Sequence, residues 1–221
     1  MTQLYVTNPF DDSPVGEVKL SSESEVDAAL AIADKTHRTN RKGLPRHERI
    51  AILKKAAEIM KGRTAELAML IASEGGKPLI DAKVEVDRAI DGVESCAAEI
   101  ANNAGIEIPM DLTPAGAGKM AFTVKEPIGP VVAVSAFNHP LNLIVHQVAP
   151  AVAAGNPVIV KPADDTPLCC KAFIEILHQA GLAREWAQFV CCDVSAAQKL
   201  VTDERVAFFS FIGSAAVGWK L

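Results

Sequence analysis

The residues from Gly129 to Ala163 constrain the fold more than any other part of the chain. They open with a short β-branched run, Val131–Val134, which is followed by apolar residues at helical spacing up to Gly155. A second apolar run then ends at Lys161. This pattern predicts two buried strands joined by a helix, which is the unit from which parallel sheets are built.

The alternation of strand and helix continues to the end of the chain. The expected elements are a helix from Thr166, a strand at Trp186–Val190, a short helix at Ser195–Thr202 and a strand at Val206–Phe211. Right-handed crossovers place such helices on both faces of a sheet. Residues 128–221 are therefore predicted to form a doubly wound, Rossmann-like α/β sheet.

Residues 1–104 predict a β-hairpin and four amphipathic helices. The hairpin strands are Leu4–Val6 and Glu17–Leu20. The helices are expected to begin near Ser21 or Ser22, Pro45, Thr64 and Pro78. None of them carries a constellation of reactive side chains, so we expect this N-terminal helical layer to cover one side of the sheet.

Residues 105–127 predict a separate feature, a protruding β-hairpin arm. Two short apolar segments, Ile106–Ile108 and Met120–Val124, flank a turn rich in proline and glycine. An isolated two-stranded hairpin is marginally stable in water, so a protruding arm needs a partner surface. The alternative is an ordinary surface hairpin.

Composition excludes several classes of function. The 221-residue chain has a net charge of -5, which argues against nucleic acid or an anionic membrane as its main partner. It contains no apolar run of about 18 residues, the length of a membrane span, and no secretory signal at its start. These features predict a cytoplasmic protein.

The five cysteines do not predict a disulfide framework. Their number is odd, and Cys169–Cys170 and Cys191–Cys192 are adjacent pairs that match no zinc-binding spacing. We interpret them as buried thiols in a reducing compartment, with a catalytic nucleophile as the alternative. His139 and His146 have no further ligand nearby in the sequence, so no metal site is predicted.

Polar residues follow the predicted strands at their carboxyl ends, where open α/β sheets bind ligands. Asn138 follows the first strand and Lys161 ends the second. After the last strand, Gly213 permits a tight turn and Ser214 can cap a helix, whose first free N–H groups suit a phosphate. Taken alone, each has a plain structural explanation as a turn residue, a solvent-reaching lysine or a helix cap.

Three segments, FNHPLN, VIVKPADDTP and FIGSAAVG, occur in an order that resembles the aldehyde dehydrogenase superfamily over nearly the whole chain. The resemblance implies the N-terminal, cofactor-binding part of an enzyme that oxidises a small aldehyde through a cysteine thiohemiacetal. It makes Asn138 a catalytic residue whose amide N–H stabilises the oxyanion. The form of the Asn138 segment looks most like the branch acting on lactaldehyde, phosphonoacetaldehyde or, without phosphorylation, glyceraldehyde 3-phosphate.

The same resemblance implies a nicotinamide cofactor. Lys161 and Asp164 would bind the adenosine ribose, and NAD is favoured over NADP because a carboxylate repels a 2′-phosphate. Ser214 would contact a phosphate, and Val217 would pack on the adenine. The remaining cofactor-binding residues that it implies are Val134, Ser135, Ala136, Phe137, Phe211 and Gly213.

The resemblance also places the family's nucleophilic cysteine and glutamate base beyond Leu221, in a catalytic domain that these residues lack. We therefore expect the 221-residue chain alone to be inactive, and its arm to join a homo-oligomer. The alternative is a stand-alone nucleotide-binding or oligomerisation module without catalysis. A short-chain reductase is disfavoured because the chain has no Tyr-x-x-x-Lys pair; its single tyrosine is Tyr5.

Overall fold

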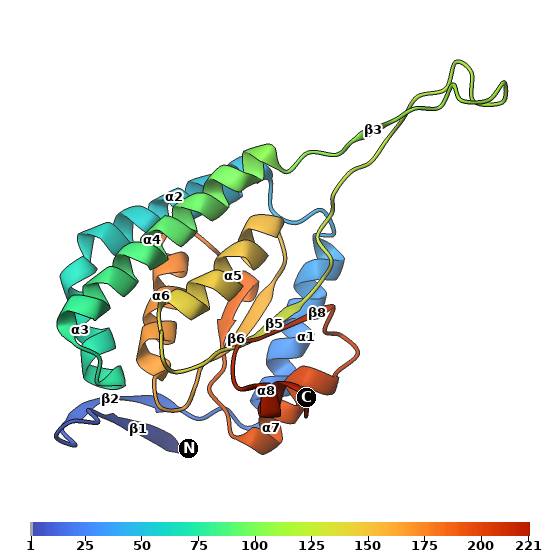
Figure 1. The fold of residues 1–221 in the computed structure, drawn as a ribbon. Helices are drawn as coiled ribbons and strands as arrows, with labels where there is room; N and C mark the ends of the chain where they lie inside the picture. The colour runs from blue at the N-terminus through green and yellow to red at the C-terminus, as the bar shows by residue number, and fades with distance from the viewer. Residues whose placement is uncertain (1) are drawn as a thin grey trace.

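A computed structural model describes residues 2–221, which form a four-stranded parallel sheet between layers of helices (Figure 1). The strands are β5 (Val131–Val134), β6 (Val158–Lys161), β7 (Ala187–Phe189) and β8 (Phe208–Phe211). Their spatial order is β7-β6-β5-β8. The predicted doubly wound α/β sheet is confirmed. The third strand is shorter than expected because a 3-10 turn, η1 (Arg184–Trp186), includes its first predicted residue.

The order of the strands reverses next to β5. The chain moves from β5 to β6 and β7 in one direction, and then returns to place β8 on the other side of β5. A ligand-binding crevice forms at such a reversal, at the carboxyl ends of the two strands that flank it. A ligand-binding crevice is therefore expected at the carboxyl ends of β5 and β8.

Helices cover both faces of the sheet. On one face lie α5 (Asn142–Ala154) and α6 (Pro167–Gln179), and on the other lies α7 (Val194–Thr202). Gly155 ends α5 in the left-handed conformation, as predicted, with φ at 85°. α5 begins two residues after Pro140, and the N–H groups of Leu141 and Asn142 are donated to the carboxylate of Glu85, which lies on α4.

The N-terminal residues form a hairpin and four helices close to the predicted bounds. These elements are β1 (Gln3–Thr7), β2 (Pro14–Lys19), α1 (Glu23–Thr39), α2 (Arg46–Gly62), α3 (Thr64–Gly75) and α4 (Leu79–Asn102). The expectation that all four helices cover one side is wrong for α1. Val26 and Leu30 of α1 share a hydrophobic core with Ile159 and Leu200, on the α7 face.

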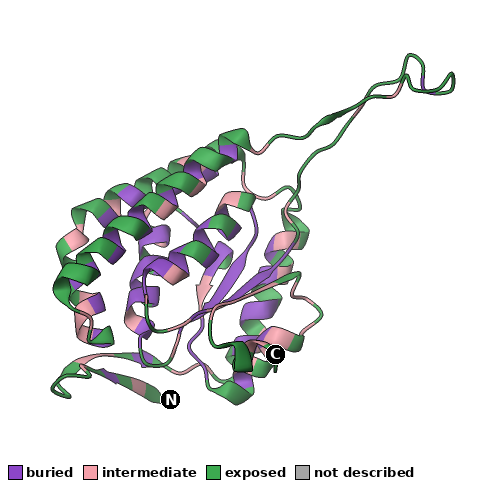
Figure 2. Ribbon diagram, in the orientation of Figure 1, coloured by how far each residue is buried: buried purple, intermediate pink, exposed green. Residues whose placement is uncertain are grey.

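The other three helices form an outer layer over α5 and α6. Their buried apolar residues belong to one large core that also contains one face of the sheet (Figure 2). In Figure 2 the buried residues gather in the sheet and on the inward faces of these helices. The apolar stripes read from the sequence therefore mark the faces that pack, although α2, α3 and α4 pack on helices rather than on strands.

The predicted arm projects away from the body of the molecule (Figure 1). Its two strands, β3 (Glu107–Ile108) and β4 (Ala121–Phe122), pair over only two residues each. Met120 and Phe122 are 86% and 70% exposed, respectively. The arm leaves the sheet at the edge opposite to α8 (Ala215–Gly218), the last helix of the chain.

Candidate functional site at the carboxyl edge of the sheet

Three of the predicted site residues lie side by side at the carboxyl edge of the sheet. Val134 of β5 is paired in register with Lys161 on one side and with Phe211 on the other. Just beyond, the Ser135 N–H donates to the Lys161 carbonyl at 3.1 Å, and the Ile212 N–H donates to the Val134 carbonyl at 2.9 Å. The segments that carry Asn138 and Ser214 therefore leave one edge from neighbouring strands.

Asn138 lies in the turn between β5 and α5 and is exposed. It lines a hollow of about 530 Å³, which we call the Asn138 hollow, together with Phe137 and His139. The opposite wall comes from α4 and the loop before it, and includes Lys77 and Arg88. An amide in this position can donate a hydrogen bond to an oxyanion that forms in the hollow.

A buried carboxylate holds this turn in place. Glu85 of α4 is 2% exposed, and one of its oxygens accepts the N–H groups of Leu141 and Asn142 at 3.0 and 3.1 Å. The other oxygen pairs with the Lys77 ammonium and lies 3.3 Å from His139 Nδ1. Glu85 thus caps α5 and anchors the residue that follows Asn138, while Lys77 compensates its buried charge.

A second buried carboxylate caps α6 in the same way. Glu74, at the end of α3, accepts the N–H groups of Leu168 and Cys169 at 2.8 and 2.9 Å. Burial raises the pKa of the Glu74 carboxyl above its ordinary value, against the opposing effect of these hydrogen bonds. The Thr166 side chain, which precedes the helix, makes no capping hydrogen bond.

The helices that begin at this edge differ in what caps them. Glu85, Glu74 and Asp193 supply carboxylates to α5, α6 and α7, the last through a 2.8 Å bond from the Ala196 N–H. The cap of α8 is a hydroxyl, since Ser214 Oγ accepts the Val217 N–H at 3.4 Å. The capping carboxylates would repel a phosphate from the N-termini of α5, α6 and α7, whereas the hydroxyl cap of α8 would not. Because α8 has four residues, it offers N–H groups rather than a large dipole.

Lys161 and Asp164 form an ion pair beside this edge. Lys161 is 9% exposed, and its ammonium donates to Asp164 Oδ1 at 2.7 Å and to the Pro162 carbonyl at 3.1 Å. Asp164 also lines a hollow of about 430 Å³ with Phe137 and with Tyr5 of the N-terminal hairpin. The hairpin thus forms a wall beside the carboxylate, a contact that local sequence did not predict.

The groups at this edge fit a dinucleotide cofactor. Ser135 Oγ is buried there and has no hydrogen-bond partner within residues 2–221. The half-exposed carboxylate of Asp164 and the ammonium of Lys161 are suitable partners for ribose hydroxyls. The exposed N–H end of α8 is suitable for a phosphate. Val134 and Ala136 are partly buried between these groups, and Val217 is about half exposed.

Gly213 lies in the bend after β8 and packs closely against the ring of Phe211. A Cβ atom at this position would lie 2.4 Å from Cζ of Phe211, whose ring folds back over the turn. The ring of Phe211 is also stacked with that of Phe209, with centroids 6.4 Å apart. Close packing against Phe211, rather than a positive φ, therefore explains the glycine.

The five cysteine thiols are buried or partly buried. Cys169, Cys170, Cys191 and Cys192 are buried, as predicted, and Cys96 is partly buried. Burial raises the pKa of Cys191 and Cys192 to about 11, and it raises the pKa of the other three thiols as well. Each of these shifts favours the protonated thiol over the nucleophilic thiolate.

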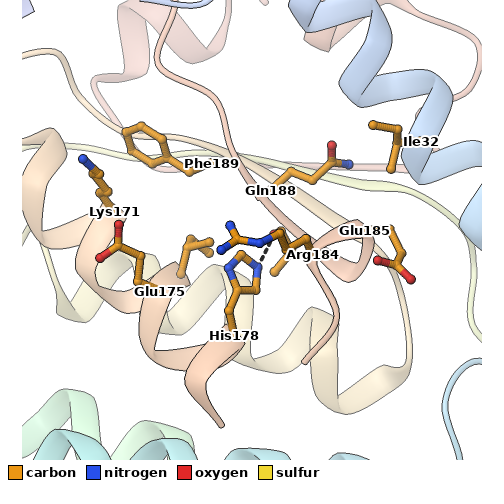
Figure 3. A pocket seen from close by; sticks show the side chains of 10 residues that line it. Ile32, Lys171, Glu175, His178, Arg184, Glu185, Gln188 and Phe189 are labelled. Atoms are coloured by element: carbon orange, nitrogen blue, oxygen red, sulfur yellow. Dashed lines mark hydrogen bonds between the residues drawn. The ribbon is translucent and has the colours of Figure 1, made fainter. Parts of the chain in front are cut away.

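The other hollows lie away from this edge. One of about 500 Å³ borders β7 and contains Lys171 and Glu175 together with His178 and Arg184 (Figure 3). The His178 ring hydrogen-bonds to the Ala187 carbonyl at 2.9 Å. Residues 2–221 contain no group of three or more potential metal ligands, and none of their helices is long and apolar enough to cross a bilayer.

Comparison with known proteins identifies the family. Residues 2–221 match the aldehyde dehydrogenase family. The chain is 34% identical over 217 residues to 3-sulfolactaldehyde dehydrogenase from Priestia aryabhattai, which covers 98% of this chain and 45% of that relative.

Two solved structures show how closely the fold agrees. Aldehyde dehydrogenase 21 from Physcomitrella patens, in complex with the reaction product succinate, superposes with a TM-score of 0.94 at 34% identity. NADP-dependent glyceraldehyde-3-phosphate dehydrogenase from Bacillus halodurans, complexed with NADP, gives 0.93 at 29% identity. Each match covers 99% of this chain and 46% of the other, so this chain spans less than half the length of these relatives. The chain belongs to the aldehyde dehydrogenase family.

Proposed function

We propose that this chain is the cofactor-binding portion of an NAD(P)-dependent aldehyde dehydrogenase that oxidises a small aldehyde to a carboxylic acid. The observation that carries the proposal is the gathering of Asn138, Lys161 and Ser214 at one edge of the sheet, beside the reversal of strand order. In this reaction a thiolate attacks the aldehyde carbon, and negative charge develops on the carbonyl oxygen. Asn138 donates its amide N–H to that oxygen, which stabilises the charge as it forms.

The cofactor, when bound, accepts the hydride from the thiohemiacetal. Lys161 and Asp164 hold the adenosine ribose, and Ser135 offers the free hydroxyl that lies beside them. Ser214 and the N–H groups that follow it hold a phosphate of the cofactor. The turn from Val134 to Phe137 and the residues Phe211, Gly213 and Val217 line the same site.

We propose that the cofactor is NAD, because the Asp164 carboxylate would lie near a 2′-phosphate and repel it. Two observations reduce the expected difference in affinity between NAD and NADP. Lys161 already neutralises part of the charge on Asp164, and the structural relative from Bacillus halodurans is complexed with NADP. The preference therefore depends on how much negative charge Asp164 retains toward the ribose.

Calorimetric titration of NAD and of NADP into the chain tests this assignment. NAD is expected to bind more tightly by about tenfold, which corresponds to one unfavourable charge contact. Asp164→Asn should narrow that ratio to near one, while Asp165→Asn, which changes the adjacent exposed carboxylate, should not. Equal affinity of the unchanged chain for both cofactors would contradict the NAD assignment, and absence of binding would contradict the cofactor site.

We propose further that the aldehyde carries a negative charge. The Asn138 hollow contains the exposed guanidinium of Arg88, and its other basic group, Lys77, is already paired with Glu85. Asp81 lines the same hollow, so its carboxylate competes with an anionic substrate for the guanidinium of Arg88. Two relatives support an anionic substrate. One is a 3-sulfolactaldehyde dehydrogenase, and the other was crystallised with the reaction product succinate; both compounds are anionic.

The arm is proposed to join copies of the chain into a homo-oligomer. Its exposed apolar side chains, including Leu112, Met120 and Phe122, have no covering surface within residues 2–221. Analytical ultracentrifugation should show an oligomer that becomes monomeric when Met120 and Phe122 are replaced by serine. A monomer at every concentration of the unchanged chain would contradict this proposal.

The alternative function is a nucleotide-binding or oligomerisation module without catalysis, and the buried thiols favour it for residues 2–221 taken alone. The 221-residue chain should bind the cofactor but should not reduce it when given small aldehydes, because no thiolate is available. Cysteine-dependent turnover by the pure chain would contradict this expectation. Intact mass of the protein from its source would separate the two functions, since a module predicts a mass of 221 residues.

A further inference from the structure

A second charged hollow lies at the opposite edge of the sheet, where the arm joins the body. Its volume is about 340 Å³, and it is lined by the start of α2, the ends of α4 and α5, and the last residues of the arm. In Figure 1 these segments meet at the top of the body, far from α8. We call it the arm-root hollow and define it by Lys42, Arg46, Arg49, Lys125 and Glu126.

Positive charge predominates in the arm-root hollow. It contains four basic side chains and one carboxylate, Glu126. The ion pairs found within residues 2–221 include none of these four cations and do not include Glu126. Several like charges around one concave surface raise the local potential and attract an anion.

Arg46 and Arg49 each hydrogen-bond to a main-chain carbonyl, but these bonds do not use all the N–H donors of their guanidinium groups. Arg46 donates to the Asn103 carbonyl at 3.0 Å, and Arg49 donates to the Ala153 carbonyl. These carbonyls lie at the C-terminal ends of α4 and α5, where basic side chains commonly bind. Each guanidinium has five N–H groups, so most of its donors are not used by these contacts.

Arg49 provides an observation independent of the charge count. It is 8% exposed, and its Nε atom is buried without a hydrogen-bond partner in the part of the chain that the structure describes. Burial and the neighbouring Arg46 also lower the pKa of the Arg49 guanidinium. A buried donor without an acceptor is unfavourable, so the Arg49 side chain, which lines this hollow, is incompletely satisfied by its contacts within residues 2–221.

We propose that the arm-root hollow binds a small tetrahedral oxyanion of the phosphate class. Arginine guanidinium groups present paired donors that match phosphate oxygens, and lysine ammonium groups add point charges. Lys125 belongs to the arm, Lys42 to the loop before α2, and the arginines to α2 itself. A bound anion would therefore connect the root of the arm to the helical layer.

Titration with inorganic phosphate at constant ionic strength, followed by calorimetry, tests the proposal. We expect saturable one-to-one binding that Lys42→Gln and Lys125→Gln each weaken by about tenfold, the effect of losing one charge-assisted hydrogen bond. Glu126→Gln should strengthen it severalfold by removing the one negative charge. Lys119→Gln, an exposed lysine of the same arm, is the matched control and should leave the affinity unchanged.

The test also separates this hollow from the proposed cofactor site. The Lys42→Gln/Lys125→Gln double variant should retain the circular dichroism spectrum and the NAD affinity of the unchanged chain, because both residues lie at the opposite edge. Phosphate should still bind when NAD is saturating. Loss of phosphate binding on addition of NAD, equal phosphate affinity in the double variant, or no saturable binding in the unchanged chain would each overturn the proposal.

Discussion

At the two edges of the sheet, side chains of opposite charge bind the ends of helices. At the carboxyl edge, Glu85 and Glu74 cap the N-termini of α5 and α6, each through two main-chain N–H groups. At the amino edge, Arg49 and Arg46 bind carbonyls at the C-termini of α5 and α4. Both arrangements complement the helix dipole, which is positive at the N-terminus and negative at the C-terminus.

The two edges differ in how the side-chain charge is compensated. Glu85 has the Lys77 ammonium beside it, whereas the arginines of the amino edge have further cations as neighbours. The compensated charge of Glu85 serves the structure, while an uncompensated charge attracts a counterion. By this criterion the arm-root hollow has unmatched charge, and among α5, α6, α7 and α8 it is α8 that has a hydroxyl rather than a carboxylate as its cap.

The comparison predicts its largest effect at Glu85. Glu85→Ala should destabilise the chain by about 3 kcal/mol, because two N–H groups lose their acceptor and the partly buried Lys77 ammonium loses its counter-charge and keeps only His139 Nδ1 as a partner. Urea unfolding followed by circular dichroism measures this change. If the pair acts as a unit, Glu85→Gln combined with Lys77→Met should be more stable than Glu85→Ala, since neither an unpaired charge nor two unpaired donors would remain.

A matched surface pair provides the control. Glu94 forms an ion pair with Lys61 at 2.6 Å, and both side chains are about half exposed. Glu94→Ala should cost less than about 1 kcal/mol, as exposed pairs usually do. Equal effects at Glu85 and Glu94 would show that the buried carboxylate does not anchor α5.

The second effect concerns Glu74 and depends on pH. Because burial raises the pKa of this carboxyl, its contribution to stability is fully present below its ordinary pKa, 4.5, and is lost as pH rises through the raised value. Glu74→Gln, which cannot titrate, should therefore be more destabilising near pH 4.5 than near pH 8. We expect about 1–2 kcal/mol at the acidic end, as for loss of a helix cap. A difference that grows with rising pH would contradict this assignment.

Local pattern predicted most of the fold, since each strand and helix has its own signal. Val131–Val134 became β5 with the predicted bounds, because a short β-branched run between turn residues suits a buried strand. The position of α1 could not be predicted in this way. An apolar stripe shows that a helix packs, but not against which face of the sheet, and here the Ser21 N–H binds the Cys191 carbonyl at 2.6 Å beyond β7.

The site was predictable to the extent that its residues follow strands. That Asn138, Lys161 and Ser214 share an edge could be predicted because parallel strands bring their carboxyl ends together. Glu85 and Glu74 were missed because their partners are 56 and 95 residues away along the chain, as in the bonds from Leu141 and Cys169. One signal was present for Glu85, which interrupts the apolar stripe of α4 as a charged residue on its buried face.

A smaller effect is expected at the amino edge. Arg46 is exposed and contributes one hydrogen bond to the Asn103 carbonyl, so Arg46→Gln should cost about 1 kcal/mol or less. Arg49 is buried and should cost more when changed to Met, about 1–3 kcal/mol, because the Ala153 carbonyl loses its partner. Urea unfolding of both variants measures the difference. The reverse order would show that burial does not set the strength of these caps.

The smallest effect on stability is expected at Ser214, and it sharpens the comparison most. None of the residues of α8 is buried, and the bond from the Val217 N–H to Ser214 Oγ is long, at 3.4 Å. Ser214→Ala should therefore change the free energy of unfolding by less than about 0.5 kcal/mol. The same change should weaken cofactor binding by about tenfold, since a phosphate loses one hydrogen bond there. Removal of a carboxylate cap is expected to have the opposite effect, a large loss of stability. A Ser214→Ala variant that unfolds more easily but binds NAD normally would therefore show that Ser214 has a structural role, like the caps of α5, α6 and α7.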